Sequence, residues 1–118
     1  MPTQDFRDLL VWQKSIELVL NIYATTRRFP SEHKWELGRQ MRRAAMSIPA
    51  NIAEGNARPH RREYLHFLYY ARSSASELST HVELATRLGL LTIEQARALE
   101  ERLDHLSRML LRLIRRLA

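Results

Sequence analysis

Histidine and carboxylate pairs are the first residues of this sequence that could do chemistry, because together they can bind metal ions. Glu63 and His66 have the Glu-x-x-His spacing of di-iron helical bundles, which need two such pairs and two further carboxylates that face inward. Helical phase places both side chains away from the apolar side of their segment. Two other pairs have a four-residue spacing and lack the required partners: Glu77 with His81 and Glu101 with His105. We therefore predict no metal site and no cofactor.

Hydroxyl and thiol nucleophiles give no catalytic pattern either. Ser73, Ser74 and Ser76 lie close together, but no recognisable base with an orienting acid accompanies them, and the chain has no glycine-rich phosphate loop. The absence of cysteine excludes disulfides and zinc-thiolate sites. No segment approaches the roughly 20 apolar residues of a membrane span. We predict a protein that is not an enzyme, does not contact a membrane and is cytoplasmic.

Arginine dominates the charged residues, with 17 arginines, 2 lysines and a formal net charge of +6. A guanidinium binds phosphate or carboxylate in a bidentate manner, so this bias favours an anionic partner or internal ion pairs. Residues 39–62 contain six arginines and Glu54 as the only acid. These six are the predicted nucleic-acid-binding residues: Arg39, Arg42, Arg43, Arg58, Arg61 and Arg62.

A second arginine group lies near the C-terminus, where no acidic neighbour is expected for Arg108, Arg112, Arg115 and Arg116. Cations at the end of a helix are favoured by its dipole, so this group is interpreted as structural. Tyr69 and Tyr70 could stack on bases beside the first group, whereas Tyr64 is expected in the core.

Apolar residues recur every three or four positions and predict four helices, over about residues 5–28, 32–56, 59–88 and 93–117. Ser31 is expected to cap the second helix, and Thr92 with Gln95 forms a capping box before a leucine heptad pattern. The expected core face of the first helix comprises Leu9, Trp12, Ile16, Val19 or Leu20, and Tyr23. We predict one all-α domain over residues 1–118, an antiparallel up-and-down four-helix bundle.

Pro49 interrupts the second predicted helix and should kink it, because proline removes one backbone hydrogen bond at a cost of about 3 kcal/mol. A polar stripe runs beside the apolar one on the same helix. Its members are Gln40, Arg43, Ser47, Asn51, Glu54 and Arg58. We interpret Gln40, Ser47, Asn51 and Glu54 as a structural polar network at a helix or subunit contact, with Glu54 paired to Arg43 or Arg58. The alternative is a ligand or nucleic-acid surface.

The phrases FRDLLVWQKSIEL, QMRRAAMSIPANIAEGNAR and SASELSTHVELATRLGLL resemble the four-helix bundle proteins encoded in intervening sequences of bacterial large-subunit ribosomal RNA genes. The likeness runs from about Phe6 to the last helix. It implies a bundle that assembles into a fivefold ring, without an established activity. A more distant similarity links the chain to accessory proteins of diversity-generating retroelements, which are basic bundles that bind nucleic acid and a reverse transcriptase. The positions that match the family pattern carry no catalytic role: Arg43, Ser47, Pro49, Asn51, Glu54 and Gly55.

Two functions follow from these observations. The first is an accessory protein that binds RNA or DNA through an arginine-rich surface of a homo-oligomer, which the resemblance implies is a pentamer. The alternative is an oligomeric scaffold whose charged stripes face neighbouring subunits or an acidic protein partner. Salt-sensitive phosphate binding distinguishes the first function from the second.

Overall fold

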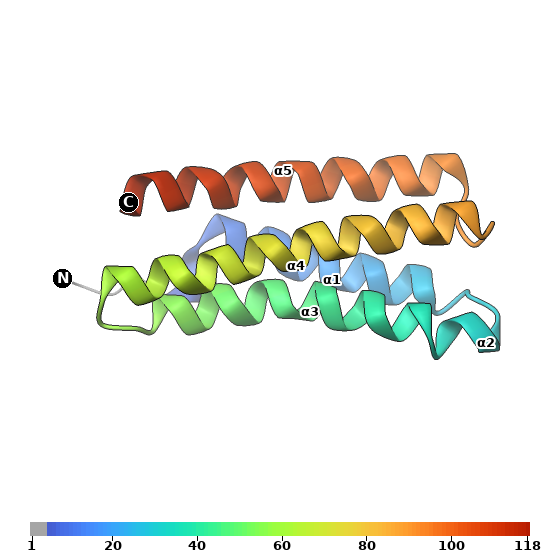
Figure 1. Cartoon of the computed structure of the whole chain (residues 1–118), viewed down its shortest axis with the longest axis horizontal. Helices are drawn as coiled ribbons and strands as arrows, with labels where there is room; N and C mark the ends of the chain where they lie inside the picture. The colour runs from blue at the N-terminus through green and yellow to red at the C-terminus, as the bar shows by residue number, and fades with distance from the viewer. Residues whose placement is uncertain (1–4) are drawn as a thin grey trace.

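A computed structural model describes residues 5–118, and four long helices account for most of this length (Figure 1). A short 3-10 helix, η1 (Phe6–Asp8), is followed by α1 (Leu10–Thr26), the single-turn α2 (Ser31–Lys34), α3 (Leu37–Asn56), α4 (Arg61–Arg87) and α5 (Ile93–Leu117). The long helices alternate in direction and form a rod of 48 × 22 × 20 Å. This arrangement confirms the predicted all-α four-helix bundle. None of the helices described has both the length and the apolar character needed to cross a bilayer.

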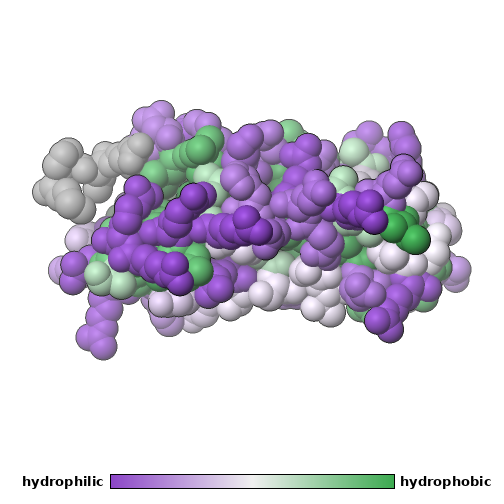
Figure 2. All heavy atoms as spheres, turned by 90° about the horizontal axis from the view of Figure 1, so that it is seen from above, coloured by the Kyte–Doolittle hydropathy of each residue, from purple (hydrophilic) through white to green (hydrophobic). Residues whose placement is uncertain are grey.

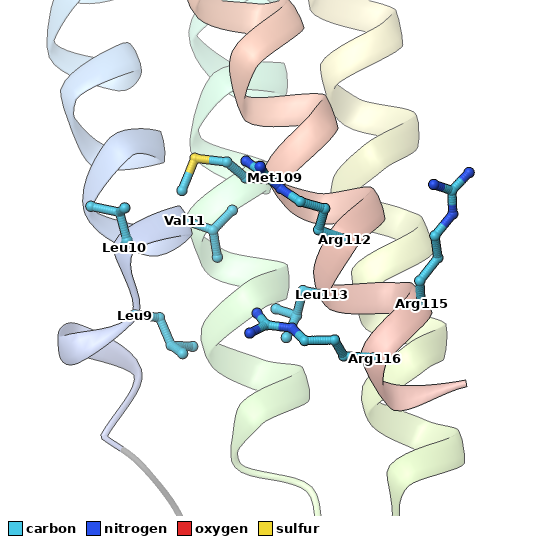
Figure 3. Close-up of a pocket in the computed structure, with 8 residues that line it drawn as sticks. All are labelled: Leu9, Leu10, Val11, Met109, Arg112, Leu113, Arg115 and Arg116. Atoms are coloured by element: carbon cyan, nitrogen blue, oxygen red, sulfur yellow. The ribbon is translucent and has the colours of Figure 1, made fainter.

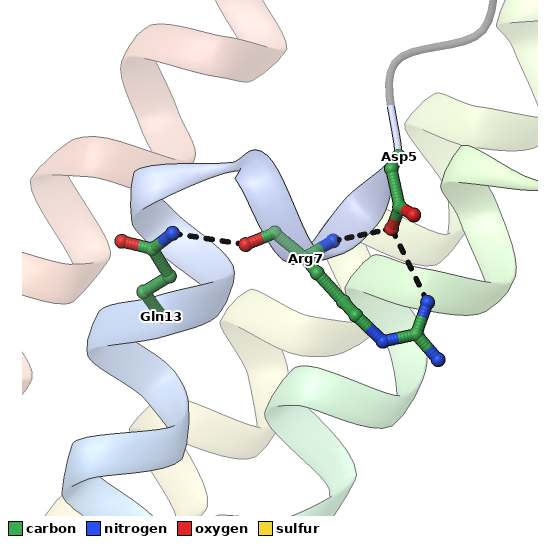
Figure 4. A network of polar contacts seen from close by, with 3 residues as sticks. All are labelled: Asp5, Arg7 and Gln13. Carbon is green, nitrogen blue, oxygen red and sulfur yellow. Dashed lines mark hydrogen bonds and ion pairs between the residues drawn. The ribbon is translucent and has the colours of Figure 1, made fainter.

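The first helix begins later than predicted, because η1 and an extended Leu9 precede α1. The Asp5 carboxylate accepts hydrogen bonds from the backbone N–H (2.9 Å) and the guanidinium (3.4 Å) of Arg7. The Gln13 amide nitrogen donates to the Arg7 carbonyl at 2.9 Å, which ties η1 to the first turns of α1 (Figure 4). Asp5 thus caps a short turn of its own, and the chain must bend at Leu9 before α1 can start.

The segment predicted as one helix over residues 32–56 is divided into α2 and α3. Ser31 was expected to be the cap but is the first residue of α2, and Pro30 occupies the N-cap position. The helical backbone breaks at Glu36, where φ is −108° and ψ is −86°. The Lys34 carbonyl at the end of α2 accepts a hydrogen bond from Arg42 of α3 at 3.1 Å. This side-chain contact satisfies a carbonyl that would otherwise require a longer helix.

The buried face of α1 differs from the predicted one. Buried positions are Val11, Ser15, Leu18, Ile22 and Thr26. On the predicted face, Leu20 and Tyr23 are exposed, with 65% and 38% of their surface accessible, and the others are half-buried. The Ser15 and Thr26 hydroxyls donate to the Trp12 and Ile22 carbonyls of the same helix, at 2.7 and 2.8 Å. Their polarity is satisfied locally, so both can lie in the core, and an apolar pattern alone could not find that face.

The last helix follows its sequence pattern closely. Thr92 and Gln95 exchange both hydrogen bonds of the predicted capping box, which is therefore confirmed. Leucines of the heptad pattern are buried as far as Leu110, and Ile114 replaces Leu113 as the buried residue of the last turns. A straight helix drifts from a strict seven-residue repeat, which accounts for this shift of one position.

The most extensive contact between helices joins α3 and α4. The helix α3 continues through the buried Pro49, so this residue does not split the element; the predicted kink stays a prediction. Near its end, a Cβ atom added at Gly55 would lie 2.8 Å from the Phe67 Cβ and 2.9 Å from Tyr64 Cδ1. Both distances are shorter than side-chain contacts allow, so the absence of a side chain at Gly55 permits the two helices to approach.

We predict that Gly55→Ala destabilises the protein by about 1–3 kcal/mol, because the new methyl group must displace α4. Helix propensity alone has the opposite sign and would stabilise α3 by about 1 kcal/mol. Chemical denaturation monitored by circular dichroism measures the difference. An unchanged or higher stability of Gly55→Ala would show that α4 accommodates the added methyl group without a loss in the free energy of unfolding.

Candidate nucleic-acid interface

The bundle places two arginine groups that are far apart in sequence at the same end. Arg58 lies in the connection after α3, and Arg61 and Arg62 open α4, which packs antiparallel to α5. The C-terminus of α5 therefore returns to the α3–α4 connection, as Figure 1 shows. We call the resulting cluster the arginine end, and its members are Arg58, Arg61, Arg62, Arg112, Arg115 and Arg116. All six are exposed.

Most side chains of the arginine end have no carboxylate partner. Arg58 pairs with Glu54 at 3.3 Å, and its guanidinium carbon lies 4.9 Å from the centre of the Phe67 ring. Within residues 5–118, the other five arginines of the cluster make no ion pair. Arg108 was expected to lack an acidic neighbour, but it pairs with Asp104 one turn earlier and so does not belong to the cluster. The positive charge of the arginine end is thus available to an anion.

An apolar recess lies beside the three arginines that α5 contributes to the arginine end. A cavity of about 560 Å³ opens between the start of α1 and the end of α5, with Arg112, Arg115 and Arg116 among its lining residues. Arg112 and Arg116 reach from α5 toward α1, whereas Arg115 points away (Figure 3). The apolar lining comprises Leu9, Leu10, Val11, Met109 and Leu113. In Figure 2 hydrophilic side chains surround a hydrophobic patch at this end of the molecule, an arrangement suited to an anion with an apolar face.

The other three predicted nucleic-acid-binding arginines lie at the opposite end of the bundle. Arg39 and Arg43 are exposed near the start of α3, about 26 and 20 Å along that helix from Asn56 at its end. Arg42 is half-buried, and its guanidinium donates to the Thr26 hydroxyl at 3.0 Å as well as to Lys34. The six predicted residues therefore do not form one surface, because the straight length of α3 separates them.

The predicted polar network is centred on two serines. The Ser47 and Ser74 hydroxyls are 2.8 Å apart and join α3 to α4. The Asn51 amide donates to the Ser47 carbonyl and hydroxyl, at 2.8 and 3.0 Å. Glu54 pairs with Arg58 rather than with Arg43, and Gln40 lies exposed without a hydrogen bond to any of these residues. Ser47 and Asn51 are thus part of a contact between helices and are not a free surface.

Residues considered for other chemistry are dispersed. Among residues 5–118, no three histidine or carboxylate side chains lie close enough to hold a metal ion. His33 and His81 are half-buried. Tyr69 and Tyr70 are 51% and 49% exposed, and the Tyr70 hydroxyl lies 2.9 Å from His66 Nε2.

A family model described as 23S rRNA-intervening sequence protein matches residues 7–112. The chain belongs to this family. The resemblance seen in the sequence is thereby confirmed, and no catalytic family is indicated. The family member is also similar to a crystal structure of a protein of unknown function from the S23 ribosomal protein family of Bacteroides thetaiotaomicron, with 26% sequence identity and a TM-score of 0.84. The match covers 90% of this chain and 96% of that one. No curated protein matches the chain.

Sequence reasoning assigned the C-terminal arginines of this family member to a structural role. The order of the helices could have predicted that these arginines lie beside the start of α4. In an antiparallel bundle, the start of the third long helix must lie beside the end of the fourth. The predicted topology therefore places Arg61 and Arg62 at the same end of the bundle as Arg115 and Arg116.

The pKa of Tyr64 on α4 reports on its distance from Arg116 on α5. Burial raises its pKa above the ordinary value of 10.0, and the positive charge of Arg116 lowers it. We predict that Arg116→Gln raises the Tyr64 pKa further, because tyrosinate loses a favourable charge interaction. The tyrosinate absorbance of each variant, compared with the same variant carrying Tyr64→Phe, isolates this residue.

Arg102→Gln is the matched control, since it removes the same charge from α5 about 21 Å farther along the helix. An equal rise in both variants, or none in either, would contradict the proximity of Arg116 and Tyr64.

Proposed function

We propose that this protein is a non-enzymatic accessory protein that binds RNA phosphates at the arginine end. The observation that carries this proposal is the convergence of Arg58, Arg61 and Arg62 with the C-terminal arginines of α5, five of the six without an ion pair in residues 5–118. An arginine without a carboxylate partner can bind phosphate without first breaking an ion pair. Several such groups at one end of a small rod suit a folded RNA backbone.

The binding we propose is electrostatic and does not read sequence. Each phosphate that an arginine neutralises releases condensed counterions, so affinity depends strongly on salt. The apolar recess beside Arg112 and Arg116 could accept an unstacked base or a ribose. Because the family description names 23S rRNA, a structured fragment of that RNA is the first ligand to test.

We predict that a labelled ribosomal RNA fragment binds the nucleic-acid-free protein and that its affinity falls as salt is raised. The triple variant Arg58→Ala, Arg61→Ala, Arg62→Ala should reduce the slope of log K against log salt by about 2–3, as expected when three phosphate contacts are lost. The triple variant Arg112→Ala, Arg115→Ala, Arg116→Ala should do the same. Fluorescence anisotropy over a range of salt concentrations measures both slopes.

A charge-matched control separates the arginine end from the net charge of the whole protein. Arg72, Arg97 and Arg102 are exposed and make no ion pair with residues 5–118, so replacing all three by alanine removes an equal charge elsewhere. This triple variant should retain most of the slope of log K against log salt that the unsubstituted protein shows with RNA. Equal losses in all three triple variants, or no binding at low salt, would refute a dedicated phosphate site.

Self-association is the second candidate function, and exposed apolar side chains on α1 and α3 favour it. Leu20 and Met46 are 65% and 41% exposed, and the Tyr23 hydroxyl donates to the Met46 sulfur at 3.4 Å. Large apolar side chains grouped on the surface commonly mark a protein contact. We propose that Leu20 and Met46 pack against another copy of the chain in a homo-oligomer.

We predict that Leu20→Glu combined with Met46→Glu lowers the molecular mass measured by analytical ultracentrifugation, because charges would be buried at the contact. Leu84→Glu, at a leucine of α4 that is 46% exposed, is the control and should leave the mass unchanged. An identical mass for all three proteins would exclude this face from the contact.

A further inference from the structure

An exposed tryptophan lies at the end of the bundle opposite the arginine end. Trp35 follows the last turn of α2, and 59% of its surface is accessible. Its backbone N–H donates to the Ser31 carbonyl at 3.3 Å, so the main chain at this residue is held by the single-turn helix. A large indole at the surface presents a flat apolar ring on which a ligand can stack.

Arg42 holds the indole in a defined setting. Its guanidinium carbon lies 5.8 Å from the centre of the Trp35 ring and 5.8 Å from the centre of the Tyr23 ring. The same guanidinium donates to Thr26 and to the Lys34 carbonyl, which links α1, α2 and α3. Arg42 is therefore committed to building the site, and the two aromatic rings are preorganised by it.

Cations without partners surround the aromatic pair. A cavity of about 270 Å³ is lined by Tyr23, Arg27, Lys34, Trp35 and Arg42, a group that we call the Trp35 cluster. Arg27 and Lys34 make no ion pair in the described part of the chain, and no acidic residue lines the cavity. Glu32 lies on the same short helix as Lys34, and its carboxylate is 3.4 Å from His33 Nε2. The cluster thus combines an exposed ring with positive charge on its rim.

We propose that the Trp35 cluster binds single-stranded nucleic acid, with one base stacked on the indole of Trp35 and flanking phosphates on Arg27 and Lys34. Exposed aromatic rings beside cations are the recurring elements of sites that bind single strands without reading their sequence. The inference rests on the proposed function for its class of ligand, but it concerns different residues. The rod is 48 Å long, so an RNA held at the arginine end would have to extend along the bundle to reach this site.

The fluorescence of Trp35 reports on stacking directly. Trp12→Phe leaves Trp35 as the single tryptophan of the chain. We expect saturable quenching when this variant is titrated with a uridine hexanucleotide at low salt. An abasic hexamer of equal charge should bind about 5- to 100-fold more weakly, the range expected when one stacked base is lost.

A pair of substitutions tests the ring itself. Trp35→Leu in the full-length protein should weaken binding of a labelled uridine hexanucleotide about 5- to 100-fold, whereas Trp35→Tyr should retain most of the affinity. Circular dichroism melts show whether each variant is folded. Equal affinities for the uridine and abasic hexamers, together with full binding by Trp35→Leu, would overturn the proposal. Equal quenching by a hexaglutamate peptide would overturn it as well, because the surface would then bind any polyanion.

The failure of this proposal can be told apart from the failure of the proposed function. The triple variant at Arg58, Arg61 and Arg62 should still show quenching of Trp35 by the hexanucleotide. If ribosomal RNA binds at the arginine end while Trp35 fluorescence does not change, the stacking site is refuted and the phosphate site stands. If Trp35 is quenched but the triple variants at the arginine end bind RNA normally, the phosphate site is refuted and the stacking site stands.

Discussion

The contact between α3 and α4 at Gly55 is the constraint on which the rest of the structure depends. Phe67 and Tyr64 occupy the space that a side chain at this position would need, so α4 runs back along α3 at close range. The short connection over residues 57–60 then fixes Arg58, Arg61 and Arg62 at one end. Since α5 packs antiparallel to α4, its C-terminal arginines must return to that end. The charge cluster is thus a consequence of helix direction.

Arginines have two different roles in this bundle, and their place in the fold decides which. Arg42 is half-buried and bonded to a hydroxyl and a carbonyl, so it connects three helices and sets the positions of two aromatic rings. Arg61 and Arg62 lie exposed at the first turn of a helix, with no ion pair to any described residue. A fixed guanidinium stabilises structure, whereas an unpaired one is available to a ligand.

Predictions from the sequence were correct where the physical signal is local. The capping box of α5 depends on two residues three positions apart, and its buried leucines follow one repeat. The predicted buried face of α1 was wrong, because the Ser15 and Thr26 hydroxyls donate to carbonyls of their own helix and these residues can therefore lie in the core. The break between α2 and α3 was missed because it involves a hydrogen bond from Arg42, eight residues beyond the carbonyl that accepts it. Three of the six predicted nucleic-acid-binding arginines lie at the end of the bundle opposite the arginine end. They are Arg39, Arg42 and Arg43.

The sequence by itself determined the helical class, the four long helices, the positive charge and the resemblance to the family. These properties depend on composition and on spacing within single segments, which apolar periodicity records. Only the tertiary structure decided which face of α1 is buried, which arginines share a surface, and that Trp35 lies beside Arg27. Such neighbours belong to different helices, and their proximity follows from the packing and direction of those helices rather than from their distance along the chain.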